Sequence, residues 1–106
     1  MDEAVPALRA RIYLRDSEVV DGTPVHGLVY SAFVDAGAGD VSVHHGIMGF
    51  DRSSGLLSLR PLRFHADRPA VVEAVGRREE IEAALTGVRR VLSRGLITVT
   101  EVELYE

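Results

Sequence analysis

The order of helix-like and strand-like segments is the feature that most restricts how this chain can fold. Residues 8–15 (LRARIYLR) alternate strictly between apolar side chains and arginine or tyrosine. A period of two is typical of a strand with one buried face. Segments 40–45, 69–76 and 96–105, each with valines or other apolar residues at strand spacing, predict three further strands. The last of these changes its apolar phase between Val99 and Val102, which predicts a β-bulge or a change of exposed face near Thr100–Glu101.

Two segments have helical periodicity instead. Thr23-Pro24 is predicted as the N-cap and first residue of a helix that runs to Ala36, where Gly37 and Gly39 end it. A second helix is predicted over 77–94, with glutamates near its start and arginines near its end, as the helix dipole favours. Gly95 closes this helix.

The resulting order is βαββαβ, in one domain spanning residues 1–106. It packs most simply as an α+β ferredoxin-like sandwich, an antiparallel sheet with two helices on one face. The other face then carries mainly charged and polar side chains, together with the apolar Val71 and Val75. That face is either solvated or an oligomer interface, and the two valines favour the interface. Arg11 and Glu73 are predicted to pair there, within or between subunits.

Composition excludes several classes of protein. The net charge of −4 argues against nucleic-acid binding, which needs a basic face. The absence of cysteine excludes disulfides and thiolate chemistry. No apolar run approaches the roughly 20 residues of a membrane helix, and the acidic start does not resemble a signal peptide. We therefore expect a cytoplasmic protein.

His44 and His45 do not form a metal motif by themselves. Neighbours on a strand point to opposite sides, so the two imidazoles cannot readily hold one ion together. A metal site would need partners from other segments, such as His26, His65 or Asp51. Hydrogen-bonded structural histidines are favoured, with His45 on the core side and His44 on the open face. We predict no metal and no other cofactor.

The segment that follows these histidines, residues 46–68, is far longer than a usual connection of about 2–6 residues, and such loops are often functional. It is predicted to be irregular, with room for a short strand near Leu56–Arg60. One hypothesis is a ligand site in which glycines allow close backbone approach and an arginine supplies charge. The other is a bulge and turn that binds nothing. The candidate ligand-binding residues are Gly46, Ile47, Met48, Gly49, Phe50 and Arg52.

Four stretches together resemble a known family: GIMGF, TPVHGLV, PAVVEAV and GLITVTEVELY. The chain resembles, over nearly its whole length, the small PII-like proteins of domain of unknown function 190. The resemblance implies the ferredoxin-like fold of PII signalling proteins, a homotrimer and no established reaction. It also implies that the long segment corresponds to the T-loop and that ligands bind between subunits at its base. The family positions that match are Gly46, Ile47, Met48, Gly49 and Phe50.

This sequence departs from PII itself in two places. The glycine-rich loop with which PII holds nucleotide phosphates corresponds here only to Arg94-Gly95, and residues 51–68 contain no tyrosine to modify. The favoured function is a trimeric regulatory module that binds a small anionic ligand, such as a nucleotide, and contacts a partner protein through its long loop. The alternative is a CutA-like metal-binding or purely structural trimer. We do not expect an enzyme, because no nucleophile stands in an identifiable His/Asp arrangement.

Overall fold

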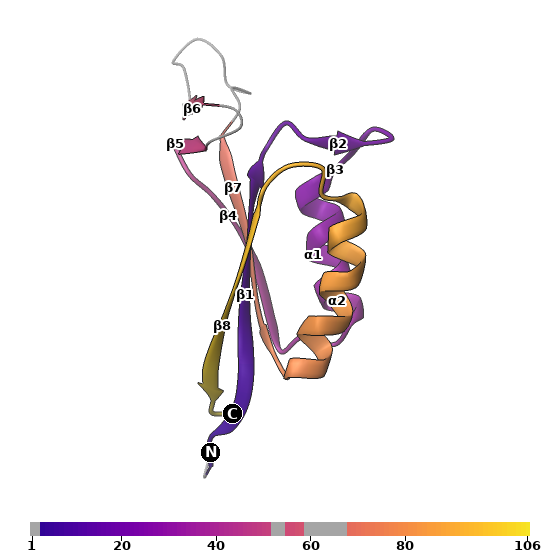
Figure 1. Cartoon of the computed structure of the whole chain (residues 1–106), viewed down its shortest axis with the longest axis vertical. Helices are drawn as coiled ribbons and strands as arrows, with labels where there is room; N and C mark the ends of the chain where they lie inside the picture. The colour runs from indigo at the N-terminus through magenta and orange to yellow at the C-terminus, as the bar shows by residue number, and fades with distance from the viewer. Residues whose placement is uncertain (1–2, 52–54, 59–67) are drawn as a thin grey trace.

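The structure is a computed structural model that describes residues 3–51, 55–58 and 68–106. Its elements follow in the order shown in Figure 1. They are β1 (Val5–Arg15), β2 (Val19–Val20), β3 (Thr23–Pro24), α1 (Val25–Asp35), β4 (Asp40–His45), β5 (Met48–Asp51), β6 (Gly55–Ser58), β7 (Pro69–Gly76), α2 (Arg78–Val91) and β8 (Leu96–Leu104). No helix among the described residues is long and apolar enough to cross a membrane.

The main sheet has the strand order β4-β7-β1-β8, and every neighbouring pair is antiparallel. Both helices lie on the same face of this sheet and pack against each other (Figure 1). This arrangement confirms the predicted α+β ferredoxin-like fold. Among the described elements, none forms a layer over the opposite face of the sheet.

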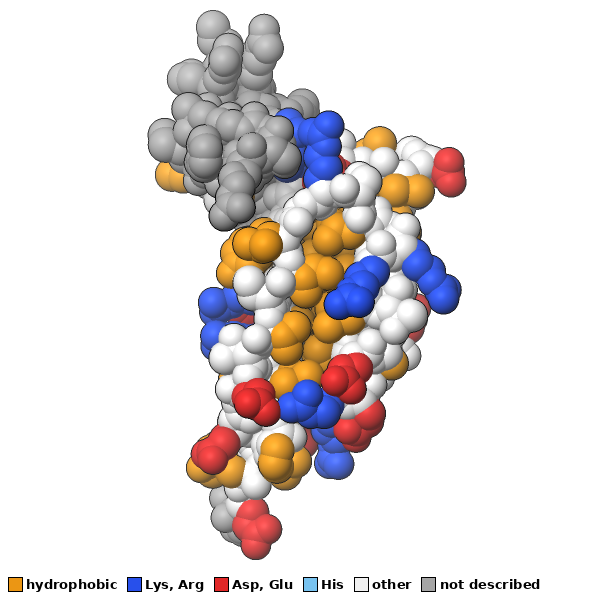
Figure 2. All heavy atoms as spheres, viewed as in Figure 1, with side chains coloured by type: hydrophobic (Ala, Val, Ile, Leu, Met, Phe, Trp, Pro, Cys, Tyr) orange, Lys and Arg blue, Asp and Glu red, His pale blue; other side chains and the backbone are white. Residues whose placement is uncertain are grey.

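The core lies between the sheet and the two helices. The strict alternation of β1 places every second side chain there, and β7 alternates in the same way. Each helix contributes one apolar stripe to the core. The stripe of α1 includes Phe33 and that of α2 includes Ile81, and both side chains are fully buried. The buried core residues are Leu8, Ala10, Ile12, Leu14, Val25, Val29, Phe33, Ala70, Val72, Ala74, Ile81, Ala84 and Val88. Figure 2 shows apolar side chains reaching the surface along the seam between β8 and the helices.

The phase change in the last strand does not come from a bulge. Pairing of β8 with β1 is continuous from Leu96 opposite Tyr13 to Leu104 opposite Val5. Ile97 is opposite buried Ile12 on the helix side, whereas Val102 falls on the other side of the sheet. The predicted bulge is therefore wrong, and the predicted change of face is confirmed. Glu101 is opposite buried Leu8 on the helix side, where its Oε2 atom lies 3.0 Å from Arg78 Nη2 of α2. The helix side of the strand is therefore polar at this point, and the next apolar side chain, Val102, lies on the opposite face.

The connection between β1 and α1 forms a small hairpin that the sequence analysis missed. Asp21 and Gly22 have positive φ angles of 50° and 79°, and they join Val20 to Thr23 in a two-residue turn. Positive φ at both central residues is the pattern of a type I′ turn. Thr23 is thus paired in a strand and provides no cap, because α1 begins at Val25 without a side-chain cap bond. The predicted Thr23 cap is wrong.

The second helix begins close to its predicted position and ends earlier. The backbone N–H of Arg77 donates to Glu80 Oε1 at 2.8 Å, so the glutamate satisfies a donor at the start of α2. The helix ends at Val91 and not at Arg94, and Gly95 then takes a φ of +124° before β8 begins. The prediction that Gly95 stops the helix directly is therefore inexact. The glycine serves the turn into the strand.

The long connection after β4 contains regular structure in its described part. β5 and β6 pair as antiparallel strands, with Met48 opposite Ser58 and Asp51 opposite Gly55. The predicted short strand near Leu56–Arg60 is thus present as Gly55–Ser58. Residues 52–54 and 59–67 of this segment lie outside the described residues.

Candidate functional site

Five of the six predicted ligand-binding residues, Gly46 to Phe50, follow one another directly after β4, at the start of segment 46–68. The N–H of Gly46 donates to the carbonyl of Pro69 at 2.8 Å, which joins the two ends of segment 46–68. Ile47 follows with 79% of its surface exposed. Met48, Gly49 and Phe50 belong to β5, and Arg52 lies outside the described residues. The role of these six residues in binding stays a prediction.

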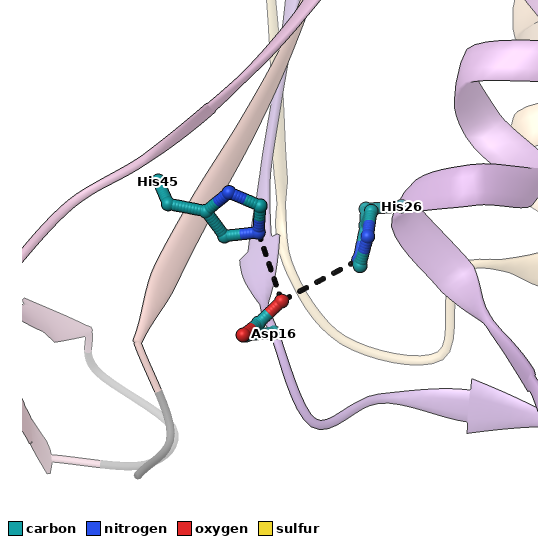
Figure 3. A group of neighbouring side chains, drawn as sticks. All are labelled: Asp16, His26 and His45. Carbon is teal, nitrogen blue, oxygen red and sulfur yellow. Dashed lines mark hydrogen bonds and ion pairs between the residues drawn. The ribbon is translucent and has the colours of Figure 1, made fainter. Parts of the chain in front are cut away.

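A second group of polar side chains lies beside the same base (Figure 3). Asp16 follows the end of β1, His26 lies in the first turn of α1, and His45 is the last residue of β4. His45 Nε2 is 2.9 Å from Asp16 Oδ1, and His26 Nδ1 is 3.7 Å from the same oxygen. The two imidazole rings meet edge to face, with centroids 5.4 Å apart.

Arg68 completes this group from the other end of the long segment. Its Nη2 atom lies 3.1 Å from Asp16 Oδ2, and its carbonyl accepts the N–H of Asp16 at 2.8 Å. Burial disfavours the Asp16 carboxylate, but hydrogen bonds from Arg68 and His45 outweigh this effect and hold the pKa of Asp16 below its ordinary value. Asp16 is therefore ionised at neutral pH.

Sequence reasoning found part of this group and missed the rest. It placed His45 on the core side and named His26 as one partner, and the structure brings these two together. It did not select Asp16 or Arg68 for the group. The signal for Asp16 was available, because the alternation that buries Leu14 places Asp16 on the same side two residues later.

His44 behaves as predicted for the opposite side of the strand. It pairs in register with Val71, whereas His45 pairs with buried Ala70. Its Nε2 atom lies 2.9 Å from Ser42 Oγ. Both histidines thus have hydrogen-bond partners, as the sequence analysis expected.

The uncovered face of the sheet carries the predicted ion pair. Arg11 and Glu73 are register partners on β1 and β7, and Arg11 Nε is 2.7 Å from Glu73 Oε2. The pair forms within one chain, which is the first of the two predicted arrangements. The hydrogen bond from Arg11, against a smaller opposing effect of burial, lowers the pKa of Glu73.

Comparison with known structures identifies the fold. A PII-like protein of Thiomonas intermedia K12, CPII, bound to ADP, AMP and bicarbonate, superposes with a TM-score of 0.73 at 14% identity, covering 96% of this chain and 91% of that one. The apo form of CPII gives a TM-score of 0.62 at 14% identity over 96% of this chain and 95% of that one. CutA1 of Oryza sativa gives 0.59 at 13% identity over 97% of this chain and 84% of that one. The fold is PII-like.

The family model is more specific. It matches residues 7–104, so the chain belongs to the family of domain of unknown function 190, described as "Uncharacterized ACR, COG1993". The resemblance seen in GIMGF and the three other stretches is thereby confirmed.

Proposed function

We propose that this protein is a homotrimeric regulatory module that binds a small anionic ligand, with an adenine nucleotide as the first choice. The observation that carries the proposal is the likeness over 96% of the chain to CPII, whose structure holds ADP, AMP and bicarbonate. In the proposed module the ligand lies between subunits at the base of segment 46–68. Segment 46–68 then contacts a partner protein, and this contact depends on whether the ligand is bound.

The proposed ligand contacts come from the residues that match the family. Gly46 and Gly49 allow backbone N–H groups to approach the anion, and Ile47, Met48 and Phe50 supply an apolar wall. Arg52 provides charge. Two observations support this choice. The hydrogen bond from the Gly46 N–H to the Pro69 carbonyl brings the two ends of segment 46–68 together. Ile47 is 79% exposed in a single chain, so an apolar side chain is available for a ligand or another subunit to contact.

The connection between α2 and β8 is too short to bind the phosphate groups of a nucleotide in the manner of PII, and this supports a ligand site at the long segment. It spans only residues 92–95, and Gly95 is its single glycine. A glycine-rich phosphate loop like that of PII has no room there. An anion must therefore be held by other groups.

Ligand binding is expected to raise the melting temperature. At about 100 times its dissociation constant, a ligand stabilises each site by about 2.7 kcal/mol, which in a chain of this size shifts the melt by roughly 10 °C. Dye-based melting would screen adenine and guanine nucleotides, cyclic dinucleotides, bicarbonate and simple dicarboxylates. The shift should shrink in Arg52→Ala and vanish in Gly49→Val.

Arg90→Ala is the matched control for the arginine, because Arg90 is exposed on α2, in the helix layer. Its ligand shift should equal that of the unmodified protein. A panel without any shift, or a shift that survives Gly49→Val unchanged, would exclude the sensor function.

The proposed trimer directs its open sheet faces inward. Tyr13, Val71 and Leu96 lie on that face by register, with Leu96 61% exposed in a single chain. A mixed apolar and charged face that no described element covers is typical of a surface that another subunit contacts. The Arg11–Glu73 pair would lie within this interface.

Light scattering should give a mass of roughly 35 kDa, three times the 11.5 kDa of one chain. Arg11→Ala should shift this mass toward the monomer, because Glu73 would be shielded in the interface without its partner. Arg90→Ala, in the opposite layer, should leave the mass unchanged. A monomer mass at micromolar concentration, or an Arg11→Ala protein with unaltered assembly, would contradict the proposed interface.

A CutA-like trimer that is structural or binds a metal is the second candidate. It is supported by the TM-score of 0.59 to CutA1 over 97% of this chain. The same melting screen separates the two, because a nucleotide shift lost in Gly49→Val is expected only for the sensor.

A further inference from the structure

We propose that Asp16, His26 and His45 form a binding site for a divalent transition-metal ion of the zinc class, with Arg68 as the positioning residue. The inference does not depend on the nucleotide site, since none of these residues belongs to the six proposed ligand contacts. It rests on the geometry of the three side chains, on one unpartnered nitrogen and on the chemistry of the donor set.

The three potential ligand atoms already converge. One atom from each residue lies within 4.8 Å of the other two, and both histidines approach the same oxygen, Asp16 Oδ1 (Figure 3). In a tetrahedral zinc site with bonds of about 2.0–2.1 Å, neighbouring ligand atoms are about 3.4 Å apart. The observed 2.9 Å and 3.7 Å to Asp16 Oδ1 bracket that spacing. Small side-chain rotations would suffice to place an ion between them.

His26 provides an independent sign of a missing partner. Its Nδ1 atom is shielded from solvent and has no hydrogen-bond partner among the described residues. A shielded polar atom normally has a partner, because leaving it unpaired forfeits its hydration. A metal ion would satisfy this nitrogen when the ring carries its proton on Nε2.

Arg68 fixes the carboxylate in the orientation that an ion would need. It holds Oδ2 at 3.1 Å and accepts the Asp16 N–H through its own carbonyl, so Oδ1 is left for the two histidines. An outer hydrogen bond of this kind commonly orients a metal ligand. The guanidinium also offsets the carboxylate charge, so moderate affinity is expected and a very tight structural site is not.

The donor set determines the class of ion. Two imidazoles and one carboxylate suit Zn²⁺, Co²⁺ and Ni²⁺, whereas Mg²⁺ and Ca²⁺ prefer oxygen ligands. Three protein ligands leave a position for water or for an anion from solution. The ion would join the ends of β1 and β4 to the start of α1, next to Gly46.

Cobalt titration of the tag-free, chelator-stripped chain of residues 1–106 tests the site, because Co²⁺ bound to nitrogen and oxygen ligands absorbs visible light. The chain has four histidines, so the alanine panel is complete. The unmodified protein should bind one Co²⁺ per chain, displaceable by Zn²⁺. His26→Ala and His45→Ala should each lower the affinity at least ~100-fold, while His44→Ala and His65→Ala should leave it unchanged.

Two further variants distinguish a loss of metal binding from a loss of folding and test the role of Arg68. Asp16→Asn keeps the shape of the side chain and should also abolish binding, and circular dichroism would verify its fold. Arg68→Ala retains all three ligands and should weaken binding by about 10-fold, as a positioning residue would. The proposal is overturned if Co²⁺ does not bind, if binding depends on His44 or His65, or if folded Asp16→Asn binds as well as the unmodified chain. In any of those cases the cluster has only a structural role and holds the adjoining elements together by hydrogen bonds.

Discussion

Replacing Gly95 by alanine is expected to destabilise the protein by about 2–4 kcal/mol, a large part of the stability of a small domain. Gly95 has a φ of +124°, a conformation that residues with a Cβ rarely adopt. An added Cβ would also lie 2.5 Å from the carbonyl oxygen of Tyr13 on β1. Since the obstructing atom belongs to the backbone of a central strand, it cannot move aside cheaply. Urea denaturation would measure the change.

Gly87→Ala is the matched control and should act in the opposite direction. Gly87 lies inside α2, and a Cβ there would meet no atom within 4 Å. Alanine should therefore stabilise the helix by about 0.5–1 kcal/mol. If Gly95→Ala were as stable as the unmodified protein, the close approach between the α2–β8 turn and β1 would be refuted.

Phe33→Ala is expected to cost about 3–5 kcal/mol, because it removes a fully buried aromatic ring and leaves a cavity. Phe33 is 0% exposed and is the largest of the fully buried side chains in the described part of the chain. At roughly 4–8 °C per kcal/mol, the melting temperature should fall by more than 10 °C. Thermal melting followed by circular dichroism would record it.

Tyr30→Ala on the same helix is the control for Phe33. Tyr30 is 40% exposed, so its truncation removes less buried surface and should lower the melting temperature by far less. Equal losses for the two variants would show that α1 does not face the sheet as described.

Local patterns were sufficient to predict most of the fold. The alternation in residues 8–15 and in 69–76 fixed which side chains of β1 and β7 face the helices, because side chains alternate strictly along a strand. The same rule placed Arg11 beside Glu73 once β1 and β7 were taken as neighbours. It also places His44 and His45 on opposite faces of β4 without reference to any tertiary contact.

The β2–β3 hairpin has a signal in the sequence that the prediction of a helix start at Thr23 does not use. Asp21-Gly22 between Val20 and Thr23 is a strong local hairpin signal, since both residues tolerate positive φ. The sequence analysis instead describes residues 16–22 as a polar connection and predicts a helix start at Thr23-Pro24. In the structure the hairpin prevails, and the helix begins after the proline.

By itself, the sequence determined the βαββαβ order, the two faces of the central strands and, through GIMGF and the stretches that accompany it, membership of the family that spans residues 7–104. Only the tertiary structure decided that Asp16, His26 and His45 converge on one oxygen and that Arg68 holds the other. The physical reason is separation along the chain. Periodicity tells which way a side chain faces, but the distance between residues on β1, α1 and β4 depends on strand order, register and helix placement together.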